Sequence, residues 1–265
     1  MKVVRRLAVV FVSLLAVSSV AEVGLRIREH GERQKVLAGR SPDDLGTVQA
    51  DPPLLYTLKP GWRGEFNSHG FRDVDRTKAK DAGTFRLAVV GDSVTMQLTI
   101  DRDKLFVRRL EGLLQHRFPE ARIECLAFRV TGYCAAQAST LMRETVVDFE
   151  PDAILWQFHL NDAADPVIDG DNGGLGRYYS RPVSQVWVSL RRRMTNLVRE
   201  GAVLRKYPGL RQRDLMLQEW YWDKTGTIID QVRELSADRG IPVFVGLFPS
   251  FPEGGDWAEY SRADL

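Results

Sequence analysis

Three short clusters of residues have the types that acyl transfer from an ester requires. Gly91-Asp92-Ser93 contains a hydroxyl group, Gly132 has a backbone N–H that no side chain shields, and Asn161 carries an amide. A serine hydroxyl can attack an ester carbonyl, and two nearby hydrogen-bond donors can stabilise the negative charge that builds on the carbonyl oxygen. The residue types therefore indicate one nucleophile, Ser93, and two oxyanion donors.

Each cluster taken alone is also typical of an ordinary turn, so their positions along the chain matter. Short apolar runs typical of buried strands precede all three, and a further run follows later in the chain. The predicted strands are Phe85–Val90, Arg122–Phe128, Ala153–Phe158 and Val243–Phe248. Helical spacing of apolar residues predicts helices between them, over about 105–118, 135–149 and 228–239, with Asp101 or Asp103 capping the first of them.

The alternation of strands and helices predicts an α/β fold whose parallel sheet is covered by helices on both faces. Ligands of such folds bind beyond the carboxyl ends of the strands. Ser93, Gly132 and Asn161 each follow a predicted strand, so we expect them to converge there. The Ser93 hydroxyl should then lie within about 8 Å of the Asn161 amide, so that both reach one bound carbonyl by hydrogen bonds.

The N-terminal region has the layout of an export signal. Lys2, Arg5 and Arg6 precede the uncharged and mostly apolar run from Leu7 to Ala21. This pattern predicts a signal peptide or membrane anchor over residues 1–27, with residues 7–27 in the membrane and the rest of the chain outside the cytoplasm. Both an uncleaved anchor and a cleaved signal are compatible with the pattern.

The remainder divides into two predicted parts. Within residues 28–84, residues 28–50 are predicted to be a polar stalk, and the turn formers between residues 51 and 73 predict an extended arm that lies on the domain rather than regular structure. Residues 85–265 form the α/β domain, with an irregular insertion at about 163–212. Cys125 and Cys134 are too few for a disulfide scaffold, and a buried free thiol is favoured over a bridge between them.

The composition argues against several classes of function. The formal net charge of +2 gives no reason to expect a nucleic-acid partner. We find no group of ligand residues at the spacing of a metal site, and the first strand lacks the glycine spacing of a phosphate-binding loop. We therefore expect neither a metal nor a cofactor.

Together the clusters resemble the conserved blocks of the SGNH, or GDSL, serine ester hydrolases. Gly91–Ser93, Gly132 and Asn161-Asp162 resemble the first three blocks. The anchor followed by Glu22-x-x-Leu-Arg, and the arm segment Asn67-x-x-Gly-Phe-Arg, resemble the exported bacterial branch. The resemblance covers roughly residues 20–250. It implies a flavodoxin-like three-layer sandwich in which Ser93 is the nucleophile and its N–H joins Gly132 and Asn161 as an oxyanion donor.

The sequence departs from the family pattern in two places. His159 replaces the glycine of the third block, and no Asp-x-x-His block follows Asp162, because His30, His69, His116 and His159 are the only histidines. Loss of a triad member typically costs on the order of 10⁴ to 10⁶ in rate. Three hypotheses follow: a truncated product that lacks the last strand and helix, a degenerate domain that only binds, and catalysis with an earlier histidine as base.

His159 is the best internal candidate for that base, because residues two apart in a strand share a face and it could point where Asn161 points. His69, in the arm, is a second candidate, with a solvated turn residue as the alternative. Asp92 and Asp162 are expected to support the turns by hydrogen bonds.

The resulting hypothesis is an exported esterase that acts on an acylated small molecule, a glycan or a lipid of the cell envelope. Its alternative is a non-catalytic carbohydrate-binding domain.

Overall fold

The computed structural model describes residues 16–27, 43–159 and 219–248, together with residues 13, 162 and 186. The side chains of residues 219–224 and 248 are outside this description. Asn161 and the predicted insertion at about 163–212, apart from residue 186, also lie outside it.

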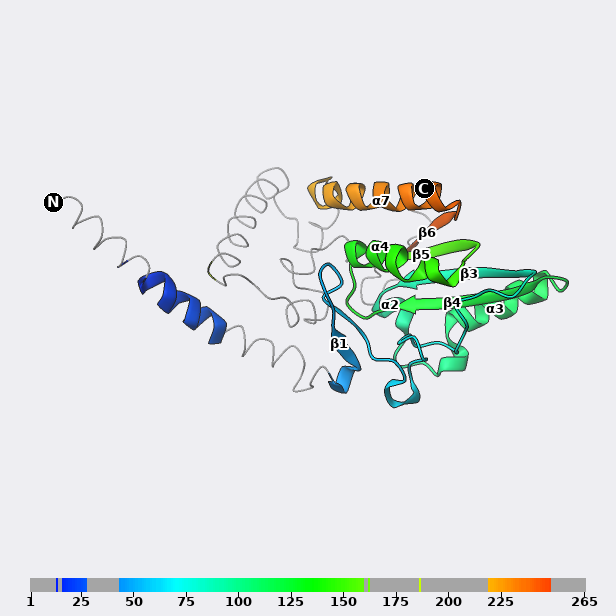
Figure 1. Ribbon diagram of the computed structural model, residues 1–265, viewed down its shortest axis with the longest axis horizontal. Coiled ribbons are helices and arrows are strands. Elements are labelled where there is room, and N and C mark those ends of the chain that lie inside the picture. Colours follow the sequence, from blue (N-terminus) through cyan, green and yellow to red (C-terminus); the bar gives the residue numbers. More distant parts are fainter. Residues whose placement is uncertain are drawn as a thin grey trace, which may run out of the picture.

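Among the described residues, four parallel strands form the central sheet (Figure 1). They are β3 (Thr84–Gly91), β4 (Arg122–Arg129), β5 (Ala153–His159) and β6 (Val243–Phe248). Their order across the sheet is β4-β3-β5-β6. This is the order of the first four strands in flavodoxin-like folds. All four predicted strands are confirmed, each within one residue at either end.

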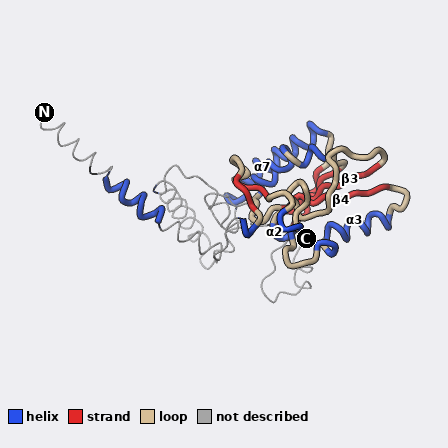
Figure 2. Tube along the Cα trace, turned by 60° about the horizontal axis from the view of Figure 1, so that its bottom comes forward, coloured by secondary structure: helices blue, strands red, loops and turns tan. Residues whose placement is uncertain are grey.

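Helices cover both faces of this sheet. α3 (Phe106–Arg117) lies on one face, and α4 (Ala135–Glu144) and α7 (Glu219–Arg239) lie side by side on the other (Figures 1 and 2). The predicted three-layer α/β/α arrangement is therefore confirmed.

Alternate residues of β3 serve the two layers. Val89 packs in the cluster on the α3 side, whereas Ala88 and Val90 pack in the larger cluster that includes residues of α4 and α7. All three side chains are fully buried. A strand segment covered on both faces favours apolar residues at successive positions, which explains why residues 87–90 are all apolar.

Three details of the helices differ from the prediction, of which the first is that α7 begins at Glu219 rather than at about residue 228. Neither Asp101 nor Asp103 caps α3, whose N-cap position is occupied by Leu105 without a side-chain hydrogen bond. Instead the Phe106 N–H donates to Gln97 Oε1 at 3.0 Å, a contact between segments that helical periodicity cannot reveal. The helix predicted over 135–149 ends at Glu144 and continues as a separate 3₁₀ turn, η4 (Val146–Phe149).

The arm contains regular structure, so the prediction of an arm without it is wrong. β1 (Thr47–Gln49) and β2 (Tyr56–Leu58) pair antiparallel, and the 3₁₀ turns η1 (Asp43–Leu45) and η2 (Trp62–Gly64) flank them. Strands of three residues have no recognisable periodic pattern, because they contain a single alternation. The arm also contributes Tyr56, Phe66 and Phe71 to the larger core cluster.

The N-terminal segment is described only from residue 13, and continuously from 16 to 27, where it is helical. Within the described part of the chain, no helix is both long enough and apolar enough to cross a bilayer. Most of the predicted apolar run from Leu7 to Ala21 lies outside that part, so the export signal or anchor stays a prediction. Cys125 and Cys134 are both buried and free, as expected.

Candidate active site

Ser93 lies directly beyond the carboxyl end of β3, where the chain enters the short helix α2 (Ser93–Met96). Its side chain is exposed, whereas the preceding Asp92 is 1% exposed. Asp92 caps the helix: its Oδ1 accepts from the Val94 N–H at 2.9 Å, and its carbonyl accepts from the Met96 N–H at 3.0 Å. The buried aspartate therefore fixes the turn that presents the serine, which is the supporting role expected for Asp92.

Gly91 is needed for close packing below this turn. A Cβ added at Gly91 would lie 2.1 Å from Thr95 Oγ1 and 2.6 Å from Gln157 Oε1. Thr95 and Gln157 are both buried and hydrogen-bonded to each other through these atoms, which joins α2 to β5. The absence of a side chain at Gly91 thus allows the nucleophile turn to pack on the neighbouring strand.

The turn that contains Gly132 leaves the sheet beside the Ser93 turn. Gly91 pairs with Arg129 at the ends of β3 and β4, and the Val130 N–H donates to the Gly91 carbonyl at 3.2 Å. Gly132 has a φ of +80°, a left-handed conformation that favours glycine. The first two predicted clusters are therefore brought together at the carboxyl edge of the sheet.

The third cluster follows β5, which lies on the other side of β3. Val90 of β3 pairs with Trp156 of β5. Ser93 follows Val90 by three residues and His159 follows Trp156 by three residues, so both residues come at the same point after a pair of neighbouring strand positions. The His159 N–H donates to Asp162 Oδ2 at 2.8 Å, so Asp162 holds this turn as expected. Asn161 lies outside the described residues, and its expected approach to Ser93 stays a prediction.

Two buried carboxyl groups lie beneath the site. Burial, followed by the charge of Asp92, raises the pKa of Asp162 to about 8. Burial also raises the pKa of Asp92, against the hydrogen bond from Val94 and the positive charge of His159. Asp92 Oδ2 and Asp162 Oδ1 are both buried and without a hydrogen-bond partner among the described atoms. Asp162 therefore keeps its proton to a higher pH than an exposed aspartate does.

The two histidines considered as bases lie in different places. His159 is close enough to Asp92 for its charge to act on that carboxyl group. The His69 ring packs on Phe149 with centroids 4.9 Å apart, and its Nε2 lies 3.0 Å from the Arg76 carbonyl. Phe149 precedes β5, so His69 lies toward the amino edge of the sheet, away from Ser93. The geometry therefore favours His159 over His69.

Several residues that hold the site were not predicted as functional. Arg72 and Tyr56 come from the arm, Arg129 from the end of β4, and Gln157 from β5. Arg129 and Gln157 are fully buried. The sequence did contain a signal for Arg129 and Gln157, because each is a charged or amide side chain in an otherwise apolar strand. Such a group is buried only when it has hydrogen-bond partners, so its presence predicts a buried polar contact.

Three apolar side chains that follow Ser93 in the sequence are exposed. Val94, Leu98 and Ile100 are 43%, 57% and 37% exposed. An acyl chain or another apolar part of an ester would bury these side chains on binding, which is favourable.

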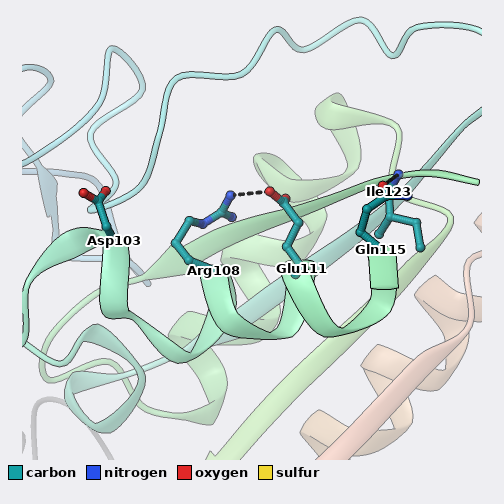
Figure 3. A pocket seen from close by; sticks show the side chains of 6 residues that line it. Asp103, Arg108, Glu111, Gln115 and Ile123 are labelled. Carbon is teal, nitrogen blue, oxygen red and sulfur yellow. Dashed lines mark hydrogen bonds and ion pairs between the residues drawn. The ribbon is translucent and has the colours of Figure 1, made fainter. Parts of the chain in front are cut away.

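A cavity of about 350 Å³ lies elsewhere, along α3 (Figure 3). Its lining includes Asp103, Arg108, Glu111, Gln115 and Ile123, but neither Ser93 nor Gly132. Its polar groups bind one another: Arg108 contacts Glu111 at 3.0 Å, and the Ile123 N–H donates to Gln115 Oε1 at 3.2 Å. Within the described part of the chain, no group of three or more acidic, cysteine or histidine residues could hold a metal ion.

Comparisons with known proteins add little to this geometry. No family model matches the chain, and a search of curated proteins finds no significant match. Among solved structures the chain is similar to an acetyl xylan esterase variant from Geobacillus stearothermophilus, with 16% identity, a TM-score of 0.32, and coverage of 63% of this chain and 78% of the other.

Two further structures are similar to the same extent. An α/β hydrolase enzyme from the metagenome of Lake Arreo, Spain, has 15% identity, a TM-score of 0.31, and coverage of 60% and 75%. A mutant acetyl-xylooligosaccharide esterase from Geobacillus stearothermophilus has 16% identity, a TM-score of 0.31, and coverage of 63% and 77%. TM-scores this low carry no argument, so the fold assignment depends on the strand order and the helix packing.

Proposed function

We propose that the chain is an SGNH-type serine ester hydrolase in which Ser93 attacks the carbonyl carbon of an acyl ester. The observation that carries the proposal is the exposed Ser93 hydroxyl on a turn fixed by the buried Asp92, beside the left-handed turn at Gly132. The N–H groups of Ser93 and Gly132, with the Asn161 amide, would hold the oxyanion. Binding there stabilises the transition state more than the substrate, because the charge develops only during attack.

The proposed base is His159. To act as a base its ring must be uncharged, and it lies close enough to Asp92, which is adjacent to Ser93 in the chain, to interact with that carboxyl group. His159 would accept the Ser93 proton as the hydroxyl attacks and return it to the leaving alcohol, while Asp162 holds the backbone of the turn. Water then hydrolyses the acyl–serine ester in a second step of the same kind.

The proposed substrate is an acylated glycan or lipid of the cell envelope, with acetyl as the first acyl group to test. This part of the proposal follows from the export pattern of residues 1–27 and from the SGNH resemblance. The proposal includes a location outside the cytoplasm, with residues 7–27 as the anchor. The apolar surface at Val94, Leu98 and Ile100 suits an ester with an apolar acyl group.

Hydrolysis of p-nitrophenyl acetate by the full chain tests the proposal. We expect Ser93→Ala to abolish turnover and His159→Gln to reduce kcat by at least about 10²-fold, since loss of a proton-transfer group typically costs that much. Ser68→Ala, at an exposed serine in the arm, is the matched control and should keep full activity. If the folded wild-type chain shows no turnover, or if Ser93→Ala retains it, the hydrolase proposal is wrong, and a binding domain becomes the better hypothesis.

A further inference from the structure

Both turns of the candidate site are held by side chains of the arm. Arg72, which is 5% exposed, reaches the far end of the Ser93 turn, and Tyr56, which is fully buried, reaches the Gly132 turn. These contacts span 25 and 75 residues of sequence. Sequence patterns within the α/β domain therefore could not reveal them.

Arg72 binds the segment that follows the nucleophile. Its guanidinium donates to the carbonyls of Gln97 at 2.9 Å, Ile100 at 2.8 Å and Met96 at 3.4 Å, and its Nε donates to Glu65 at 3.1 Å. These carbonyls lie at and beyond the end of α2, where a helix leaves its last carbonyls without intrahelical partners; the Gln97 carbonyl also accepts from the Ile100 N–H at 3.0 Å. A guanidinium can bind several carbonyls at fixed angles, whereas an ammonium group has no such planar fork.

Arg129 completes this arrangement from the sheet. It is fully buried and donates to the Thr95 carbonyl at 2.7 Å and to the Arg72 carbonyl. The arm is thus tied to the sheet at the same point at which it binds the nucleophile segment. Burial lowers the pKa of Arg129 to about 10, which still leaves the guanidinium charged at neutral pH.

Tyr56 binds the second turn. Its hydroxyl donates to the Thr131 carbonyl at 2.8 Å, one residue before Gly132. The Tyr133 hydroxyl donates in return to the Tyr56 carbonyl, and the two rings pack edge to face with centroids 5.3 Å apart. The peptide that leads into Gly132 is therefore fixed on its carbonyl side, which sets the direction of the following N–H.

We propose that Arg72 and Tyr56 are positioning residues of the hydrolase site: Arg72 holds the Ser93 turn and Tyr56 holds the Gly132 turn, so that nucleophile and oxyanion donor keep their relative geometry. The inference relies on the proposed function for its kinetic consequence. Its structural part, order in the two turns, does not depend on any activity. Displacement of a reacting group by about 1 Å can cost on the order of 10²-fold in rate.

Arg72→Lys and Tyr56→Phe test the inference, because the first keeps the charge and the second removes a single hydroxyl. Arg86→Lys is the matched control. Arg86 is 1% exposed and binds the carbonyls of Lys78 and Phe149, but it lies near the beginning of β3, at the edge of the sheet opposite Ser93. Arg129→Lys provides a second test of the Ser93 turn if Arg72→Lys does not fold.

The first measurement is inactivation by a fluorophosphonate, which separates the rate constant of covalent attack from the binding constant of the probe. We expect Arg72→Lys and Tyr56→Phe to lower the attack rate constant by about 10- to 100-fold without a matching change in binding. Arg86→Lys should leave both constants unchanged in the folded fraction. Equal losses in all three variants would show a purely structural role and would overturn the inference.

The second measurement, amide hydrogen exchange, works even if the wild-type chain is not labelled. Arg72→Lys should accelerate exchange at the Met96 and Gln97 amides, and Tyr56→Phe should do so at the Tyr133 amide, relative to the rest of the sheet. Arg86→Lys should not. Absence of labelling together with this local acceleration would reject the hydrolase proposal and keep the positioning role. Unchanged local exchange would reject the positioning role.

Discussion

At the scale of single residues, Gly91 controls the space beneath the nucleophile turn. Replacement by alanine would place a methyl group 2.1 Å from Thr95 Oγ1, so Thr95 or the turn must move. We expect Gly91→Ala to lower the free energy of unfolding by about 1–3 kcal/mol, as overpacking does, and to reduce Ser93 reactivity. Urea titration followed by circular dichroism measures the first effect.

Gly112 provides the control for this prediction. It lies within α3, and a Cβ there would meet nothing within 4 Å. Gly112→Ala should raise the free energy of unfolding by about 0.5–1 kcal/mol, because glycine is a poor residue for a helix interior. If Gly91→Ala and Gly112→Ala change the free energy of unfolding in the same direction, steric contact at Gly91 does not determine the effect of Gly91→Ala.

Asp162 makes the stability depend on pH. Burial and the charge of Asp92 raise its pKa from 3.8 in the unfolded chain to about 8 in the folded chain. Between these values the folded chain keeps a proton that the unfolded chain has lost. The stabilisation is therefore complete below about pH 4 and is lost as the pH rises to about 8, by at most about 1.4 kcal/mol per pH unit.

Asp162→Asn should remove this contribution. The amide stays neutral and its oxygen can still accept from the His159 N–H, so the fold should persist with a flatter dependence of stability on pH between about 4 and 8. The raised pKa values of Asp92 and Asp73 leave a remaining slope of the same sign. Denaturant midpoints measured across that range would contradict the assignment if wild type and variant showed equal slopes.

At the scale of elements, the arm is part of the folded core rather than a spacer. Phe71 is 7% exposed and packs edge to face on Phe128 of β4, with centroids 5.0 Å apart. Phe71→Ala should therefore cost about 3–5 kcal/mol in free energy of unfolding, as truncation of a buried phenylalanine does. Leu113→Ala, at a side chain 67% exposed, should change it by less than about 0.5 kcal/mol. A small effect at Phe71 would mean that the arm does not pack on the domain in solution.

The elements also show where prediction from sequence succeeds. The strands β3, β4, β5 and β6 were predicted almost to the residue, because each is a short, mainly apolar run. β1 and β2 were missed, because their three-residue strands contain too little alternation and depend on packing against the domain. The break after Glu144 was missed for a related reason, since apolar spacing continues through the following 3₁₀ turn.

At the scale of the whole molecule, the turns that contain Ser93 and Gly132 follow paired strands at one edge of the sheet, and their convergence on one carbonyl stays a prediction. Ser93 and Gly132 could be proposed as site residues from the sequence alone, because each follows a predicted strand. Parallel strands end at one edge of a sheet, so residues that follow them are expected at that edge. The arginine and tyrosine contacts from the arm depend on how a separate segment docks, and sequence separation of 25 to 75 residues hides them. Asn161 stays a prediction.

The central claim is that Ser93 is an activated nucleophile. Treating the folded full chain with a fluorophosphonate and locating the adduct by peptide mass spectrometry tests this claim most directly. The account predicts one adduct, on Ser93, that disappears in Ser93→Ala and persists in Ser68→Ala. A folded chain that stays unmodified, or an adduct on another serine that persists in Ser93→Ala, would contradict it.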